Sequence, residues 1–245
     1  MALSTEVLLV LLIFALYLKD CVLMLRTNEA VMVRGVRGRW RAGFGARSWR
    51  WGGREPYLAN PLLPHEAVFR LRWSLQGVGG SDRSLARLLG ARDEVLWLAP
   101  GAWVTWLLLF LIIPWALLAK EPHVPLLAAA GLLYLSIAAS LVCAWLVRDK
   151  VALSARGFAV LAFECLACPP YAANIVRRVV GHQRADEDFV LAITRLLPPD
   201  RLAAANLECL ARVDEELEVE EGDSHVAAML KASRLRFVSE KPREH

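Results

Sequence analysis

Three long apolar blocks divide the chain, at residues 7–25, 103–119 and 126–147. The second and third contain no charged residue, and neither has the polar face that helices of soluble proteins keep. A helix of about 20 mostly apolar residues spans the hydrocarbon core of a bilayer, which is roughly 30 Å thick. The pattern therefore predicts three transmembrane helices, and Pro114 predicts a kink in the second of them.

The first block is interpreted as an uncleaved anchor rather than a signal peptide. A signal peptide has a basic N-terminal region and a small-residue cleavage site. Here Glu6 precedes the block without Lys or Arg, and no Ala-x-Ala pattern follows it. Lys19 and Asp20 lie near its end, where a Lys side chain can reach the headgroups.

The distribution of basic residues predicts the orientation. Arginines follow the first block, precede the second and follow the third, whereas the loop at 120–125 has only Lys120. Because basic residues concentrate in cytoplasmic loops, we expect residues 26–95 and 148–245 in the cytoplasm and the N-terminus outside, with a bacterial inner membrane as the location. Four tryptophans are expected to form an aromatic belt at the cytoplasmic interface: Trp97, Trp103, Trp106 and Trp145.

Small residues form a stripe on the third block. Ser136, Ser140 and Ala144 are spaced four residues apart, so they lie on one helix face. Small residues allow helices in lipid to approach closely. The stripe predicts packing against the helix of the first or second apolar block, and packing against a partner protein is the alternative.

Alternation of apolar and basic residues predicts strands between the first two blocks. In residues 67–73, Phe69, Leu71 and Trp73 face one way and the intervening arginines the other. We expect a small antiparallel sheet, turns at the Asn60–Pro61 and Leu63–Pro64 steps, and a helix capped by Ser81 or Asp82.

The segment after the third block is predicted to be helical. Residues 151–168 are apolar but include Arg156 and Glu164, so they are interpreted as an interfacial helix that ends at Pro169–Pro170; a fourth span is the alternative. Three polar helices are expected to follow, capped by Asp186, Asp200 and Ser224.

The amino-acid composition agrees with this division of the chain. Hydrophobic residues make up 56% of the chain, above the roughly 45–50% usual for soluble proteins. The sequence thus predicts a mainly α-helical membrane protein. We expect an anchor over residues 1–25, an Arg/Trp-rich cytoplasmic domain with short strands over 26–95, a transmembrane hairpin over 101–147, and an interfacial helix plus a helical cytoplasmic tail over 148–245.

Arginine and tryptophan alternate in the 26–95 segment and mark a candidate interaction surface. Its residues are Arg39, Trp40, Arg41, Arg47, Trp49, Arg50 and Trp51. The plainest interpretation is positive-inside bias plus an aromatic core. Anionic lipid headgroups or an acidic protein partner are the alternatives, and nucleic acid is less favoured. An acidic run at 214–223 is interpreted as a solvated helix end or linker, with docking onto a basic surface such as this Arg-rich segment as the alternative.

The only pattern with a chemical name is the pair Cys165 and Cys168. A Cys-x-x-Cys pair serves as a redox dithiol or as half of a metal site, but no second pair accompanies it. We therefore interpret both as packing residues and expect no cofactor or metal. No nucleotide-binding or hydrolase motif is present in the sequence.

These observations favour a non-catalytic membrane anchor, scaffold or accessory subunit that presents a cytoplasmic surface to a protein partner. The alternative is a membrane-interface enzyme or lipid-binding protein that acts on an anionic substrate through the Arg-rich loop.

Overall fold

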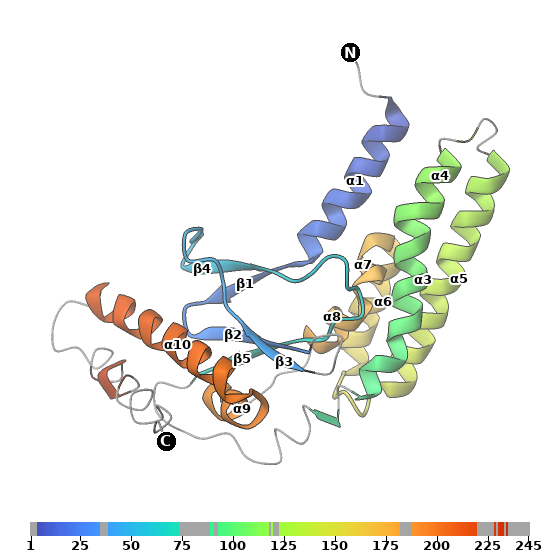
Figure 1. Ribbon diagram of the computed structural model, residues 1–245. Helices are drawn as coiled ribbons and strands as arrows, with labels where there is room; N and C mark the ends of the chain where they lie inside the picture. Colours follow the sequence, from blue (N-terminus) through green and yellow to red (C-terminus); the bar gives the residue numbers. More distant parts are fainter. Residues whose placement is uncertain are drawn as a thin grey trace. The chain divides into compact units, whose positions relative to one another are not determined.

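Helices make up most of this computed structural model, alongside a small antiparallel sheet region (Figure 1). The structure describes residues 4–34, 39–73, 89–90, 93–117, 119, 123–181, 188–219, 228, 230–232 and 234. The chain forms two compact units. Unit 1 comprises Met1–Leu23, Leu58–Val68 and Leu88–Arg184, and unit 2 comprises Met24–Tyr57, Phe69–Arg87 and Ala185–His245.

The helices of unit 1 include the second and third apolar blocks. Its elements are α1 (Thr5–Asp20), η1 (Leu96–Leu98), α3 (Ala99–Leu107), η2 (Leu108–Ile112), α4 (Ile113–Leu117), α5 (His123–Val147), α6 (Ala155–Ala167), α7 (Pro169–Ala173) and α8 (Ile175–Gly181). Two continuous helices, Asp93–Leu117 and His123–Val147, are long and apolar enough to cross a membrane. Only 33% and 28% of their most apolar windows are buried, so most of these side chains face outward.

The first predicted span is shorter than expected. Helix α1 ends at Asp20, and Val22–Arg26 form strand β1, so the helix does not continue to residue 25. The Asp20 carboxylate accepts hydrogen bonds from the side chains of Asn174 and Arg178, which fixes the end of the helix inside unit 1. With 16 residues, α1 is about 24 Å long, below the length of a full span.

A π-helical turn distorts the helix that contains Pro114. The turn, η2, directly precedes α4, in which Pro114 is the second residue. Proline has no N–H to donate to the carbonyl of Phe110, and its ring crowds that carbonyl. A π-turn is one of the recognised origins of a helix kink, and the kink itself stays a prediction.

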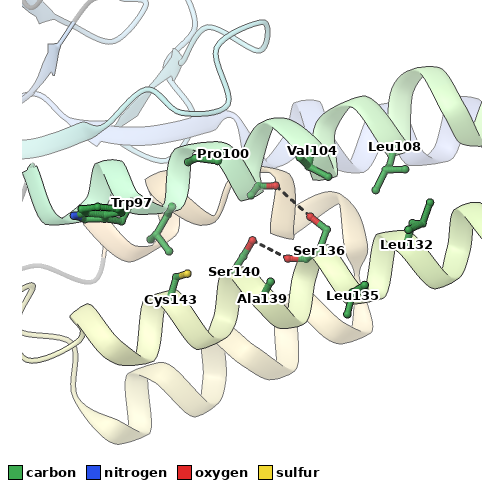
Figure 2. A pocket seen from close by; sticks show the side chains of 12 residues that line it. Trp97, Pro100, Val104, Leu108, Leu132, Leu135, Ser136, Ala139, Ser140 and Cys143 are labelled. Atoms are coloured by element: carbon green, nitrogen blue, oxygen red, sulfur yellow. Dashed lines mark hydrogen bonds between the residues drawn. The ribbon is translucent and has the colours of Figure 1, made fainter.

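The small-residue stripe of α5 packs against α3, as one of its two interpretations predicted (Figure 2). The Ser136 hydroxyl lies 3.0 Å from that of Thr105 and 3.5 Å from the Gly101 carbonyl oxygen. The Ser140 hydroxyl donates to the Ser136 carbonyl oxygen at 2.8 Å. A Cβ on Gly101 would lie 2.1 Å from Ser140 Oγ, so a larger residue there would require the Ser140 hydroxyl to rotate away.

The predicted interfacial helix is α6, which is capped by Ser154 and ends before Pro169. It runs back along α5, because Phe158 packs on Trp145 at 4.9 Å and Tyr134 donates to the Leu166 carbonyl oxygen at 3.5 Å. With 13 residues, α6 is about 20 Å long and too short to be a fourth span.

Unit 2 is built on short strands and two helices. Its elements are β1 (Val22–Arg26), β2 (Glu29–Arg34), β3 (Trp40–Gly43), β4 (Arg54–Leu58), β5 (Val68–Arg72), α9 (Phe189–Leu196) and α10 (Pro199–Val219). One sheet has the order β3-β2-β5, and β1 pairs with β4. Strands β2 and β3 are antiparallel, with Val31 opposite Gly43 and Arg34 opposite Trp40.

The alternation in β5 is confirmed. Phe69, Leu71 and Trp73 are at most 2% exposed, whereas Arg70 and Arg72 face outward. The two predicted turns, at Asn60–Pro61 and Leu63–Pro64, are also present, closed by backbone hydrogen bonds from Leu63 to Asn60 and from Glu66 to Leu63.

Helices α9 and α10 begin differently from the prediction, and all the predicted caps except Asp200 lie outside the described residues. Asp188, rather than Asp186, caps α9, and its carboxylate accepts from the Val190 N–H. Helix α10 begins at Pro199, which suits the first turn because it has no N–H, so Asp200 lies inside the helix. The caps expected at Ser81, Asp82, Asp186 and Ser224 are outside the described part of the chain.

Candidate functional site

A tight hairpin connects residue 51 to β4 in unit 2. Trp51 and Arg54 exchange backbone hydrogen bonds of 2.8 and 3.1 Å across Gly52 and Gly53. These glycines have φ of 58° and 71°. Two positive φ angles in a two-residue loop are what a type I′ hairpin turn needs, and glycine adopts them without strain.

Two indoles project from this hairpin into solvent. Trp49 is 74% exposed and Trp51 is 84% exposed. A tryptophan side chain normally buries most of its surface, so two neighbouring exposed indoles leave a large apolar area without protein cover. We call Trp49, Trp51 and the Gly52–Gly53 turn the hairpin tip.

The arginine next to these indoles is held away from them by acidic residues. Arg50 pairs with Glu55 at 3.1 Å and with Glu215 of α10 at 3.0 Å. Arg47 pairs with Glu208 of the same helix at 2.8 Å and donates to the Glu208 carbonyl oxygen at 3.2 Å. The arginines therefore attach the hairpin to α10.

A buried ion pair lies beneath this attachment. Arg212 of α10 is 1% exposed and donates to the fully buried Glu55 carboxylate and to the Gly45 carbonyl oxygen, the latter at 2.8 Å. Its Nε lies 3.1 Å from Glu208. A Cβ on Gly45 would lie 2.4 Å from that of Glu55, so the backbone approaches this closely only at a glycine.

The acidic run at 214–223 is thus not wholly solvated. Glu215 pairs with Arg50, and Asp214 pairs with Arg234 at 2.6 Å. The alternative interpretation of this run, docking onto the Arg-rich loop, therefore holds for Glu215. Residues 220–223 lie outside the described residues.

The remaining residues of the candidate surface fall into two groups. Trp40 is 7% exposed and packs on Phe69 with ring centroids 5.9 Å apart, so it belongs to the core of unit 2. Arg39 and Arg41 are exposed and have no ion-pair partner among the residues described.

A second acidic carboxylate of unit 2 is held charged by arginines. Glu29 is fully buried and accepts from the Arg26 N–H and from the side chains of Arg70 and Arg72. Burial opposes ionisation, but these hydrogen bonds prevail and hold the pKa of Glu29 below its usual range.

Unit 1 contains a charged cluster that the sequence did not reveal. Arg178 of α8 bridges the carboxylates of Asp20, at 2.5 Å, and Glu164. Burial disfavours its charge, but the two acids raise the pKa of Arg178 above its ordinary value. Asn174 also donates to Asp20, at 3.1 Å. These side chains join the ends of α1, α6 and α8.

Arg177 lies beside this cluster and is 7% exposed. It donates to the carbonyl oxygens of Asn60 and Leu63, to Asn174 Oδ1 at 2.8 Å and to Cys21 Sγ at 3.1 Å. Asp20 is far in the sequence from Glu164 and Arg178, and no motif spacing connects the three residues. The one available signal was the presence of Asp20 and Glu164 inside apolar segments, which often marks a partnered site.

The Cys165 and Cys168 pair has the character of packing residues. Cys165 is fully buried in α6, and burial raises the pKa of its thiol to about 12. Burial also raises the pKa of Cys168, which ends that helix. A high pKa keeps a thiol protonated and unreactive at neutral pH. Both are free thiols, and no group of three or more His, Cys, Asp or Glu suited to a metal occurs in the described ranges.

Comparison with known proteins adds no family assignment. No protein-family model matches the chain, and neither the curated proteins nor the solved structures contain a match to it.

Proposed function

We propose that this chain is a non-catalytic, membrane-anchored interaction protein whose unit 2 presents the hairpin tip to a protein partner in the cytoplasm. The observation that carries the proposal is the exposure of Trp49 and Trp51 on a turn that two glycines and α10 hold in place. Tryptophans that project from a rigid element are typical of the residues that dominate protein-binding energy.

The membrane location rests on where unit 1 exposes its apolar side chains. Helices α1, α3 to α5 and α6 all expose large ones, among them Leu12, Trp115, Leu135 and Phe163. Such a surface is costly in water and favourable in lipid. We place Asp93–Leu117 and His123–Val147 across a bacterial inner membrane, with the N-terminus outside, as the basic residues favour.

Helix α1 is the third membrane-embedded helix of this proposal. Leu8, Leu11 and Leu12 are each more than half exposed on it, as lipid-facing residues are. Its length of about 24 Å is shorter than the hydrocarbon core. Local thinning of the bilayer and the Lys19 side chain, which reaches the headgroups, compensate for this mismatch.

Co-purification from mild detergent tests the interaction. We would compare the wild-type chain, the double variant Trp49→Ala/Trp51→Ala, and Trp115→Ala, which removes an indole that is 65% exposed on α4. We expect a stoichiometric protein partner with the wild type and with Trp115→Ala. The loss of both indoles should cost about 2 kcal/mol or more in total, which weakens capture by a factor of roughly 30 or greater. A double variant that retains the partner, or a wild-type chain that carries only lipid, contradicts the proposal.

Binding of anionic lipid headgroups is the second candidate function. It is favoured by one observation, the exposure of Arg39 and Arg41 without ion-pair partners in the described part of the chain, whereas Arg47 and Arg50 are already paired. Flotation with vesicles containing phosphatidylglycerol distinguishes the two functions. Binding that is lost in Arg39→Gln/Arg41→Gln but kept in Trp49→Ala/Trp51→Ala supports the lipid function.

A further inference from the structure

An apolar groove of about 440 Å³ runs between α3 and α5 (Figure 2). Its rim is formed by outward-facing side chains that include Trp97, Val104, Leu132 and Leu135, which are 73%, 47%, 55% and 66% exposed. Its floor is formed by small residues, among them Gly101, Ser136, Ala139 and Ser140. The groove exists because these small residues provide no side chain to fill the space above them.

The lining of the groove is almost entirely apolar, and its two serine hydroxyls already have hydrogen-bond partners within the chain. Ser136 Oγ lies within hydrogen-bond distance of Thr105 Oγ1. It also contacts the Gly101 carbonyl oxygen, and Ser140 Oγ donates to the Ser136 carbonyl oxygen of its own helix (Figure 2). No charged residue lines it. A polar ligand would lose its hydration there and gain few hydrogen bonds in return, whereas an apolar ligand pays no such desolvation cost.

The groove covers only half of the helical hairpin. It extends from Trp97 to Leu108, which is about 16 Å along a helix and close to half of a hydrocarbon core of roughly 30 Å. The Trp97 end is the polar end of the hairpin, where Lys150 pairs with Glu94 at 2.6 Å. The other end, at Leu108 and Leu132, lies near the middle of both helices.

We propose that this groove holds one acyl chain of a phospholipid from the leaflet at the Trp97 end, which is the cytoplasmic leaflet. The inference rests on the proposed membrane location of these two helices. Trp97 then lies at the level of the headgroups, as an interfacial indole does. The acyl chain of the lipid lies over Ala139 and reaches the bilayer centre beside Leu108.

A transmembrane helix fits the groove less well than an acyl chain. A packed helix lies 8–10 Å from its neighbour and presents ridges of side chains along a whole span. This groove ends at mid-span, so a helix would contact it over half its length only. A flexible chain that belongs to one leaflet matches both its length and its apolar lining.

Photo-crosslinking tests the assignment. The full chain is reconstituted in nanodiscs with phosphatidylglycerol that has a diazirine in the middle of one acyl chain, and the crosslinked peptides are mapped by mass spectrometry. We expect labelling concentrated on residues of the groove, such as Val104, Leu135 and Ala139. Ala139→Trp fills the groove and should lower this labelling by about tenfold, as expected when two or more buried CH₂ groups are displaced.

The neighbouring residue supplies a matched control. Ala138 is exposed on the same helix but does not line the groove, so Ala138→Trp should leave the groove labelling unchanged. Labelling spread evenly around α5 and unaffected by Ala139→Trp overturns the inference. If Ala139→Trp does not fold, the distribution of label on the wild-type chain decides.

The same experiment distinguishes failure of the groove assignment from failure of the proposed membrane location on which it rests. Labelling of outward residues such as Trp115 and Leu12, without preference for the groove, contradicts the groove assignment alone. No labelling on any helix of unit 1 contradicts the membrane location itself.

Discussion

The two units distribute charge and apolar surface in opposite ways. In unit 1, Arg177 and Arg178 are inside and leucines cover the outside of the helices. In unit 2, the apolar residues form a core, and within Met24–Tyr57, Phe69–Arg87 and Ala185–His245 the described large apolar side chains that are exposed are Trp49, Trp51 and Leu207. A unit with an apolar exterior suits lipid and one with a polar exterior suits water, so the exposed indoles of unit 2 are the exception, and the proposed protein partner rests on them.

Arg212→Ala should have the largest effect, because unit 2 depends on a charge pair that is wholly removed from water. Without the guanidinium, the buried Glu55 carboxylate has lost its closest countercharge, and we expect a loss of about 3–5 kcal/mol in unfolding free energy. Arg234→Ala is the control, because its pair with Asp214 is half-exposed and worth about 1 kcal/mol or less. Chemical unfolding of the full chain in detergent measures both, and equal effects would contradict this view of unit 2.

Arg178→Gln should have a somewhat smaller effect in unit 1. The variant leaves Asp20 and Glu164 without their shared cation in a partly buried cluster, which we expect to cost about 1.5–3 kcal/mol. Arg156→Gln removes an exposed arginine of α6 and should leave stability nearly unchanged. The midpoint of thermal unfolding in detergent compares them. Equal midpoints would mean that the cluster does not hold α1, α6 and α8 together.

Gly53→Val should weaken the hairpin tip while both indoles remain. A β-branched residue at a φ of 71° is strained by about 1–2 kcal/mol. We expect faster amide exchange around Trp51 and weaker capture of the partner. Arg54→Val is the control for this variant, because it places the same valine side chain in a strand, where a β-branched residue fits. Unchanged capture by Gly53→Val would show that the shape of the tip does not matter.

The smallest expected effect is a pH dependence from His65 in unit 1. Its Nδ1 accepts from the Trp103 indole at 3.0 Å, and burial, followed by the charge of Arg177, lowers the pKa of His65 below 6.5. The unfolded chain then binds the proton first, so stability should fall as the pH drops through 6.5. His65→Gln should flatten this part of a melting-temperature profile, and an unchanged slope would assign it to another group.

Regular patterns were predicted from the sequence where local periodicity decides the structure. Helix α5 and the alternating strand β5 were expected close to their observed bounds, because an uncharged 22-residue block and a two-residue alternation each fit one structure. The small-residue stripe that includes Ser140 was predicted to pack against the first or second apolar block, and it packs against α3 of the second. Helix ends were less well predicted, as α1 shows, because the Asp20 contacts that end it come from distant residues.

The candidate site was predicted only in part for the same reason. Trp49 and Trp51 were singled out and are exposed, but Trp40 has the same Arg-flanked pattern and is buried, because its partner Phe69 comes from another strand. The pairing of Arg50 with Glu215 spans most of the chain, and so does that of Asp20 with Arg178. Charge composition indicates that such pairs can form, but only the fold determines which residues meet.

Hydroxyl-radical footprinting of the purified chain in nanodiscs tests the contrast between the units most directly, since the radicals act from water and tryptophan is a sensitive reporter. Trp51 and Trp115 are 84% and 65% exposed, so in the absence of lipid both should be oxidised. We expect strong oxidation of Trp51 and protection of Trp115 by the bilayer, with the buried Trp73 protected as an internal reference. Equal oxidation of Trp51 and Trp115 would place unit 1 in water and contradict the account, and protection of both would place the hairpin tip in lipid rather than in contact with a protein.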